Sequence, residues 1–204
     1  MEKPVLELHD VSVFYPGQRL LFKKSQLFQA LHSIKLELQR SEILAIVGES
    51  GSGKSTLGKA IVGLVEDING RFIYDSSEYD PMNMHDLRGE IQIIFQDALS
   101  SLNPRMKIGS AIKDVIKLHH PETDADQELL NLFVKVDLPS DSRNKFPHEL
   151  SGGQRQRACI ARALAVEPKV LICDEVVSAL DVSVQAKILN LLLKLVNDDG
   201  LSIL

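Results

Sequence analysis

The spacing of apolar residues divides the chain into strand-like and helix-like stretches. Apolar and polar positions alternate over residues 5–15 and 34–39, which is typical of half-exposed strands. Residues 43–47 and 170–173 are apolar without a break, as parallel strands buried on both faces are. The pattern predicts an antiparallel β-layer near the N-terminus, followed by a mostly parallel sheet.

Helix-like spacing occupies the stretches between these runs. Apolar residues recur every three or four positions after residue 56, within residues 98–165, and again from residue 184, where Gly200 is placed to end the helix. Further strand-like runs lie at residues 91–95 and from Ser202 onward, so we expect an α/β fold. The residues that define the helices are Leu57, Ile61, Leu64 and Val65, then Leu129, Leu132, Phe133 and Val136, then Val184, Ile188, Leu191, Leu192 and Leu195.

The sequence GESGSGKST, residues 48–56, joins an apolar run to a helix-like segment. Its spacing is that of a phosphate-binding loop, because Gly48 is followed after four residues by Gly53, Lys54 and Ser55. Glycines let several backbone N–H groups surround a polyphosphate, and the helix adds the positive end of its dipole. Lys54 is predicted to reach the β- and γ-phosphates, and the Ser55 hydroxyl to ligate Mg²⁺. The loop predicts binding of a nucleotide triphosphate by Gly48, Glu49, Ser50, Gly51, Ser52, Gly53, Lys54, Ser55 and Thr56.

Composition and charge are those of an ordinary globular protein. Of the 204 residues, 44% are hydrophobic and 25% are charged, so the chain can bury a core. The net charge of −5 argues against a nucleic-acid partner. Cys159 and Cys173 lack metal-ligand spacing, and Cys173 is expected to be a buried small hydrophobe. Without a disulfide framework or a signal-peptide pattern, we expect a reducing cytosol and, at most, a peripheral membrane role.

Three further sequences identify the family that the chain resembles. LSGGQ occupies residues 150–154, Gln96 precedes the helical stretch, and VLICDE ends at Glu175. With the phosphate loop, and in this order and spacing, they resemble an ATP-binding cassette (ABC) ATPase over nearly the whole chain. The resemblance implies a P-loop NTPase core with a mostly parallel sheet and an antiparallel β-layer, formed by residues 1–97 and 166–204. It implies an inserted helical subdomain over residues 98–165.

The resemblance also implies catalytic roles for residues outside the loop. Asp174 is implied as a Mg²⁺ ligand, which would compensate a carboxylate at the end of a buried strand. Glu175 is implied as the general base that polarises the attacking water, and Gln96 as the residue that senses the γ-phosphate and Mg²⁺. The implied reaction is hydrolysis of ATP, with charge stabilisation by Lys54 and Mg²⁺.

The residue that contacts adenine has competing candidates. Tyr15 is the favoured candidate, because it lies where the family places an aromatic side chain that stacks on the base, and its neighbour Phe14 is the competing one. A core aromatic without a ligand is the third interpretation. Because stacking tolerates any base, we expect this contact to add affinity more than selectivity.

A second group of residues is implied to act across a dimer. A helix is expected to begin at LSGGQ, where a serine suits the N-cap and glycines permit close backbone approach. The resemblance implies that this helix end faces the γ-phosphate held by a second ATPase subunit, and that Asp181 crosses the interface. Hydrolysis is therefore expected to require a homodimer or heterodimer. The helix-end residues are Ser151, Gly152, Gly153 and Gln154.

Two longer strings narrow the subfamily. FQDALSSLNPR, residues 95–105, and SALDVSVQAKILNLL, residues 178–192, resemble the ATPase subunits of oligopeptide, dipeptide and nickel importers. This implies a peripheral subunit at the cytoplasmic face of the cell membrane, bound to permease subunits and served indirectly by an extracytoplasmic solute-binding protein. The alternatives are a soluble ABC ATPase outside transport and a truncated, catalytically silent ATP-binding or regulatory module.

The sequence departs from the family pattern at a few positions. Ser41 stands where a glycine normally turns the chain into the first core strand. Ala98 replaces a proline, and Val176 and Val177 replace a Pro-Thr or Ala-Val pair, none of which removes a catalytic group. The family also expects a γ-phosphate-contacting histidine beyond Ser202, and no histidine follows Glu175. We therefore expect a fragment or truncated form that binds Mg-ATP and hydrolyses it poorly.

Overall fold

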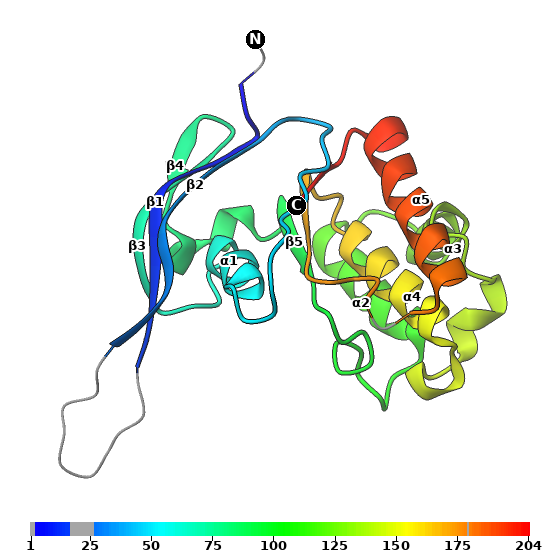
Figure 1. The fold of residues 1–204 in the computed structure, drawn as a ribbon. Helices are drawn as coiled ribbons and strands as arrows, with labels where there is room; N and C mark the ends of the chain where they lie inside the picture. Colours follow the sequence, from blue (N-terminus) through cyan, green and yellow to red (C-terminus); the bar gives the residue numbers. More distant parts are fainter. Residues whose placement is uncertain (1–2, 17–26, 179) are drawn as a thin grey trace. The chain divides into compact units, whose positions relative to one another are not determined.

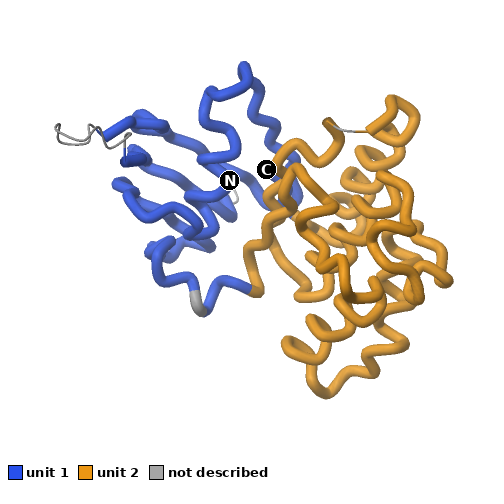
Figure 2. Tube along the Cα trace, turned by 90° about the horizontal axis from the view of Figure 1, so that it is seen from below, with its two compact units in different colours: residues 1–88, 202–204 blue, residues 89–201 orange. Residues whose placement is uncertain are grey.

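The computed structural model describes residues 3–16, 27–178 and 180–204, which divide into two compact units (Figures 1 and 2). Unit 1 lies within residues 1–88 and 202–204, and unit 2 comprises residues 89–201. A basic stretch of the sequence, with Arg19, Lys23 and Lys24, is expected to be a solvated loop and lies outside the described residues. No helix of the described ranges combines the length and apolar character that crossing a membrane requires.

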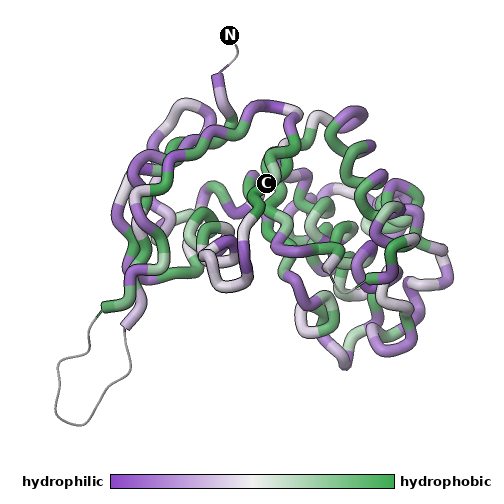
Figure 3. Tube along the Cα trace, in the orientation of Figure 1, coloured by the Kyte–Doolittle hydropathy of each residue, from purple (hydrophilic) through white to green (hydrophobic). Residues whose placement is uncertain are grey.

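Unit 1 contains the antiparallel β-layer that the alternating pattern predicted. Its four strands are β1 (Leu6–Pro16), β2 (Leu27–Leu38), β3 (Asp67–Tyr74) and β4 (Ser77–Tyr79), in the order β2-β1-β3-β4. All three pairings are antiparallel, and the alternation of apolar and polar residues along β1 is visible in Figure 3. The apolar side chains of Leu6, Leu8 and Leu38 are fully buried, so one face of this layer forms the core of unit 1.

The β3–β4 hairpin was not predicted. The two strands are joined by Asp75 and Ser76, whose φ angles of 47° and 68° are those of a type I′ turn. Tyr79 closes the hairpin onto α1, because its hydroxyl donates to the Ile61 carbonyl at 3.2 Å. The available signal was a run of β-branched and aromatic residues before a short polar turn.

The helix after the phosphate loop, α1 (Lys54–Ile61), is shorter than predicted. Leu64 and Val65 lie beyond its end: Leu64 is 56% exposed, whereas Val65 is buried. Two 3₁₀ turns, Pro81–Asn83 and His85–Leu87, complete unit 1.

The prediction of a buried parallel strand over residues 43–47 was wrong. The only pairing of this segment within the described residues is a parallel bridge between Ile43 and Ile203, and Val47 is 93% exposed. In the bonds to β7 (Ser202–Ile203), the Ile203 N–H donates to the Glu42 carbonyl at 2.7 Å and the Leu44 N–H donates to the Ile203 carbonyl at 2.8 Å. An apolar run needs a paired neighbour to become a regular strand.

Unit 2 combines a parallel strand pair with a helical layer. The strands β5 (Ile91–Ile94) and β6 (Val170–Cys173) pair in parallel, with Ile91 opposite Val170. The helices are α2 (Ile108–His119), α3 (Ala125–Lys135), α4 (Gly152–Leu164) and α5 (Val182–Asp199), with 3₁₀ turns at Ser140–Asn144 and Pro147–Glu149. Both strands and the helical character of residues 98–164 agree with the predictions. The fold is the α/β class expected.

The helical layer is held by apolar contacts and by buried arginine. The predicted apolar face of α3 is buried, with Leu129, Phe133 and Val136 at most 1% exposed. Arg157 of α4 is 8% exposed, and its guanidinium donates to the Val136 carbonyl at the end of α3, which satisfies a carbonyl that has no partner within the helix. Gly200 ends α5 with φ 69°, as predicted.

Candidate functional site

The phosphate loop of unit 1 is closed by its own lysine. Lys54 is the first residue of α1, and its Nζ donates to the carbonyl oxygens of Gly48 at 2.9 Å and Glu49 at 2.8 Å. The Ser52 N–H donates to the Glu49 carbonyl at 3.2 Å, which closes a turn within the loop. The ammonium therefore lies at the start of the loop, where it can exchange two neutral carbonyl oxygens for charged phosphate oxygens.

The start of α1 has the features that an anion requires. Gly53 adopts φ 100°, and a Cβ there would lie 2.7 Å from Leu31 Cδ2 of β2, so only glycine fits this close approach. No side chain caps α1 and its first turn has no acidic residue, so the positive end of the helix dipole is not neutralised there. A polyphosphate fits this cradle by charge and by the close approach of the backbone.

The two candidates for the adenine contact are neighbours on β1. Tyr15 pairs with Phe28 of β2, and Phe14 pairs with Gln29 of β2 and Asp67 of β3. Both aromatic side chains are half-buried. Successive residues of a strand point to opposite faces, so one of them at most can stack on a given base. The preference for Tyr15 stays a prediction.

In unit 2, two predicted catalytic residues that lie 79 positions apart in the sequence are hydrogen-bonded. Gln96 follows β5, Glu175 follows β6, and Gln96 Nε2 donates to Glu175 Oε2 at 2.8 Å. The Asp174 N–H extends the strand pair by donating to the Ile94 carbonyl at 2.9 Å. Glu175 itself has φ 51°, a left-handed conformation that is strained for a residue with a side chain. The parallel strands thus bring an amide and a carboxylate to one edge.

Each unit carries oxygen donors of the kind that Mg²⁺ takes when it binds together with a nucleotide. No group of three or more His, Cys, Asp or Glu side chains within the described residues could hold a metal ion alone. Mg²⁺ in phosphate-transfer sites is held by one or two carboxylates together with substrate phosphates. Asp174 and the oxygen of Gln96 are such oxygen donors in unit 2, and the Ser55 hydroxyl is one in unit 1.

The start of α4 is a capping box. The Ser151 hydroxyl accepts from the Gln154 N–H at 3.3 Å, and Gln154 Oε1 accepts from the Ser151 N–H at 3.0 Å. A Cβ on Gly153 would lie 2.6 Å from Val184 Cγ1 of α5, so this glycine lets the two helices approach. The prediction that Ser151 is the N-cap of α4 is confirmed. The side chains of Ser151 and Gln154 are both used to cap the helix. An anion at this end would contact the backbone N–H groups of Gly152 and Gly153.

Asp181 is the N-cap residue of α5, but its carboxylate does not cap the helix. Its carbonyl accepts from the N–H groups of Val184 at 2.9 Å and Gln185 at 2.8 Å. The side chain is exposed, which leaves the carboxylate available to a partner.

Ser178 joins this part of unit 2, and the sequence reasoning did not single it out. Its hydroxyl donates to the Glu175 carbonyl at 3.0 Å and lies 3.4 Å from Gln96 Nε2. The available signal was the three-residue spacing from Glu175, because a serine at that distance readily bonds back to the backbone of a turn.

The two cysteine thiols of unit 2 are shielded from water. Burial raises the pKa of the Cys159 thiol to about 11, and that of Cys173 to about 12. Cys159 is buried as a residue, whereas Cys173 is partly exposed and not fully buried as expected. Neither thiol suits nucleophilic chemistry near neutral pH.

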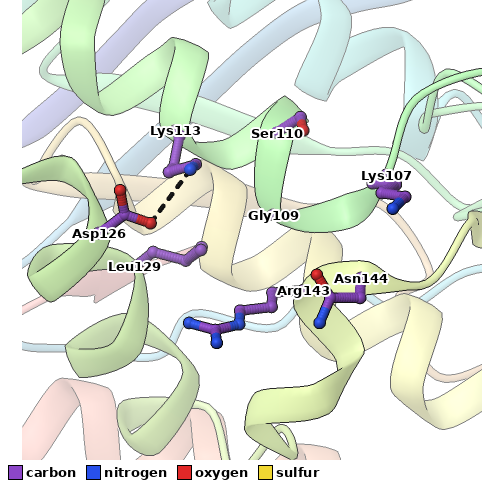
Figure 4. A pocket seen from close by; sticks show the side chains of 8 residues that line it. All are labelled: Lys107, Gly109, Ser110, Lys113, Asp126, Leu129, Arg143 and Asn144. Carbon is purple, nitrogen blue, oxygen red and sulfur yellow. Dashed lines mark hydrogen bonds and ion pairs between the residues drawn. The ribbon is translucent and has the colours of Figure 1, made fainter.

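Unit 2 also has a pocket of about 290 Å³ among its helices (Figure 4). It is basic, because Lys107, Lys113 and Arg143 line it with the single carboxylate of Asp126, which pairs with Lys113 at 3.1 Å. Leu129 forms an apolar part of its wall. None of the residues predicted to bind nucleotide lines this pocket.

Comparison with known proteins places the chain in a family. The sequence profile described as "ABC transporter" matches residues 31–178. The oligopeptide transport ATP-binding protein OppF of Haemophilus influenzae is 43% identical over 98% of this chain, and that of Salmonella typhimurium is 42% identical over 99%. The glutathione import ATP-binding protein GsiA of Escherichia coli is 43% identical over 99% of the chain. The chain spans 63% of the length of the two OppF proteins and 33% of GsiA.

Solved structures agree on the fold. The ATP-binding cassette MJ0796, in a dimeric post-hydrolysis state bound to ADP and Pi, matches with a TM-score of 0.83 and 28% identity over 97% of this chain and 85% of that chain. A second match is cbiO1 from Clostridium perfringens, which is part of the ABC transporter complex cbiONQ. Its TM-score is 0.81 and its identity 28%, over 99% of this chain and 77% of the cbiO1 chain. The profile match alone covers more than half of the residues. The chain belongs to the ABC transporter family and carries its ATP-binding cassette fold.

Proposed function

We propose that this protein is an ATP-binding and ATP-hydrolysing subunit of a membrane importer for peptides. The observation that carries the proposal is the phosphate loop, in which the Lys54 ammonium bridges the carbonyls of Gly48 and Glu49 directly before an uncapped helix. Triphosphate oxygens would replace these carbonyls, because a negatively charged phosphate oxygen attracts the ammonium more strongly than a neutral carbonyl oxygen does. The family and the relatives support ATP as the nucleotide.

The chemistry would be attack of water on the γ-phosphate. The Glu175 carboxylate would accept a hydrogen bond from the attacking water and act as the general base that takes up its proton. Lys54 would stabilise the negative charge that develops on the transferred phosphoryl group. Asp174, Gln96 and Ser55 are the proposed Mg²⁺ ligands. Bound Mg²⁺ would neutralise phosphate charge. The glycine N–H groups that begin α4 would offer an anion site to the nucleotide of a second subunit.

The proposed cargo is a peptide. The relatives described above are named for oligopeptide transport and glutathione import, and none of these names supports the nickel half of the expectation. The dimeric relative supports a second ATPase subunit, identical or paralogous, as one partner. Permease subunits at the cytoplasmic face of the membrane, with an extracytoplasmic solute-binding protein acting through them, complete the proposal.

The decisive test is ATP titration by calorimetry, with and without Mg²⁺, of the unaltered chain and two lysine variants. Lys54→Ala should weaken ATP binding at least tenfold, because it removes charge-assisted bonds worth about 1.5–3 kcal/mol. Lys59→Ala, in the last turn of the same helix, is the matched control and should bind ATP normally. Equal affinity of the Lys54 variant and the unaltered chain would refute the assignment of the loop.

Hydrolysis separates this proposal from a silent ATP-binding module. In a phosphate-release assay, Glu175→Gln should lower the rate by about a hundredfold or more while leaving ATP binding intact, since it removes a general base. ATP binding without any phosphate release from the unaltered chain, at concentrations that allow dimers to form, would favour the silent module.

A further inference from the structure

Three residues of unit 2 form a closed set of hydrogen bonds at the carboxyl ends of β5 and β6. Gln96 Nε2 donates to Glu175 Oε2 at 2.8 Å and to Ser178 Oγ at 3.4 Å. Ser178 in turn donates its hydroxyl proton to the Glu175 carbonyl at 3.0 Å, and its backbone N–H donates to the same oxygen at 3.1 Å. Glu175 is held in its left-handed conformation, φ 51°, by the turn that these bonds close.

The number of protons available determines whether the Ser178 hydroxyl donates or accepts in each of these hydrogen bonds. A serine hydroxyl has one proton, and here that proton goes to the Glu175 carbonyl. Toward Gln96 the hydroxyl oxygen can only accept. Glu175 Oε2 also accepts here. Two acceptors therefore face the side-chain amide of Gln96, and the two protons of its Nε2 match them.

The orientation of the Gln96 amide follows from this count. Turned by 180°, the amide would place its carbonyl oxygen against the carboxylate and lose that hydrogen bond, and the Ser178 hydroxyl could donate to the turned amide only by giving up its bond to the Glu175 carbonyl. The observed orientation leaves Oε1 on the opposite side of the amide, where no hydrogen bond to it occurs among the described residues. A carbonyl oxygen suits Mg²⁺, whereas an NH₂ group does not.

We propose that Ser178 is a positioning residue: it fixes the Gln96 amide so that Oε1, and not Nε2, is presented to Mg²⁺. The inference rests on the proposed function, in which Gln96 is a Mg²⁺ ligand. Ser178 itself touches neither the metal nor the phosphates in this proposal. Loss of its hydroxyl leaves Glu175 as the only acceptor that holds the amide, so the turned form becomes more populated and the metal binds more weakly.

The test measures how much Mg²⁺ strengthens nucleotide binding, which needs no turnover. ATP affinity is determined by calorimetry in EDTA and in Mg²⁺, and the ratio of the two affinities is compared between variants. Ser178→Ala should lower the ratio by roughly three- to tenfold, the effect of one hydrogen bond, with unchanged affinity in EDTA. Ser178→Thr keeps the hydroxyl and should restore the ratio. Ser183→Ala, an exposed serine at the start of α5, is the control and should leave it unchanged.

A spectroscopic readout tests the orientation directly. In ¹⁵N–¹H spectra, the side-chain amide signals of Gln96, assigned through Gln96→Glu, should shift in the Ser178→Ala variant and return in Ser178→Thr. An unchanged Mg²⁺ ratio and unshifted amide signals in Ser178→Ala would overturn the inference alone. Absence of ATP binding by the unaltered chain in both EDTA and Mg²⁺ would instead overturn the proposed function, and the inference with it.

Discussion

The segments that lead into the two halves of the proposed machinery are held in different ways. Val170–Cys173, before the acidic pair, is paired with β5 along its whole length, and Val170 and Leu171 are fully buried. Residues 43–47, before the phosphate loop, touch β7 at one bridge, and Val47 is 93% exposed. The carboxylates thus stand on a rigid strand, whereas the loop depends on α1, on the contact of Gly53 with β2 and on the Lys54 bonds.

Such a difference has a consequence for ligand binding. A segment with few backbone partners opens at low free energy, while a paired and buried strand opens only when much of the structure does. Because a ligand stabilises the conformation it binds, nucleotide should order the phosphate loop and its leading segment more than it orders β6.

The largest expected effect is in amide hydrogen exchange. The Val170 N–H donates to the Glu90 carbonyl at 3.0 Å and the Asp174 N–H to the Ile94 carbonyl at 2.9 Å, whereas the amides of residues 45–47 have no hydrogen-bond partner within the described ranges. Exchange at Ile46 and Val47 should therefore be about a thousandfold faster or more. Equal protection in both segments, measured by NMR without nucleotide, would mean that residues 43–47 are paired in solution.

Thiol labelling should separate the two regions by at least about a hundredfold. Burial raises the pKa of the Cys159 thiol to about 11, so little thiolate is present at pH 8. Val47→Cys places a thiol at the exposed position, and mass spectrometry can follow both sites in one sample. Comparable labelling rates for residues 47 and 159 under native conditions would contradict the contrast in burial.

The same thiol gives a pH dependence whose sign is fixed. The pKa of Cys159 is raised above its ordinary value of 9.0 in the folded state, so folding favours the protonated thiol. Its contribution to stability is complete below pH 9 and is lost as the pH rises toward about 11. Cys159→Ala, melted between pH 7 and pH 11, should show a smaller loss of stability over this window than the unaltered chain.

Replacing valine by alanine should lower the free energy of unfolding by different amounts at residues 170 and 47. Val170→Ala removes buried methyl groups and should lower the free energy of unfolding by about 2 kcal/mol. Val47→Ala removes the same groups from an exposed side chain and should change it by less than about 0.5 kcal/mol. Denaturant titration of both variants checks the pair, and a loss of equal size at Val47 would place that side chain in a core.

The sequence predicted those strands and helices whose formation depends on residues close together in the chain. The alternating strands, the apolar face of α3 and the Gly200 end of α5 follow from spacing alone, since each depends on neighbours within a few residues. The strand expected at residues 43–47 depended on a partner elsewhere in the chain, and among the described residues this segment pairs only through the bridge between Ile43 and Ile203. Apolar runs of equal character can therefore end as different structures.

The candidate site shows the same division. The spacing of the phosphate-loop motif was enough to predict the roles of Gly53 and Lys54. Both the left-handed backbone of the glycine and the position of the lysine depend on residues within the loop itself. The hydrogen bonds from Gln96 to Glu175 and Ser178 depend on how β5 and β6 meet, because these residues lie 79 and 82 positions apart in the sequence. Only the structure could supply those contacts.

The smallest expected effect concerns the turn that precedes the exposed segment. Ser41 has φ 53°, a conformation that costs a residue with a Cβ about 1–2 kcal/mol and suits glycine. Ser41→Gly should stabilise the chain by about 0.5 kcal/mol, since part of the gain is offset by the greater flexibility of glycine when unfolded. The Ser41 N–H bond to Ser202 Oγ, at 3.0 Å, is retained in this variant.

A helix position provides the matched control for this change. Ala186→Gly, on the exposed side of α5, should destabilise the chain by about 1 kcal/mol, because ordinary helical geometry gives glycine no advantage. Thermal melts of both variants should therefore shift in opposite directions, by about 2 °C upward for Ser41→Gly and about 3 °C downward for Ala186→Gly. If Ser41→Gly also destabilises, the serine side chain contributes more to the turn than the left-handed backbone costs, and the segment before the phosphate loop is held more firmly than its exposure indicates.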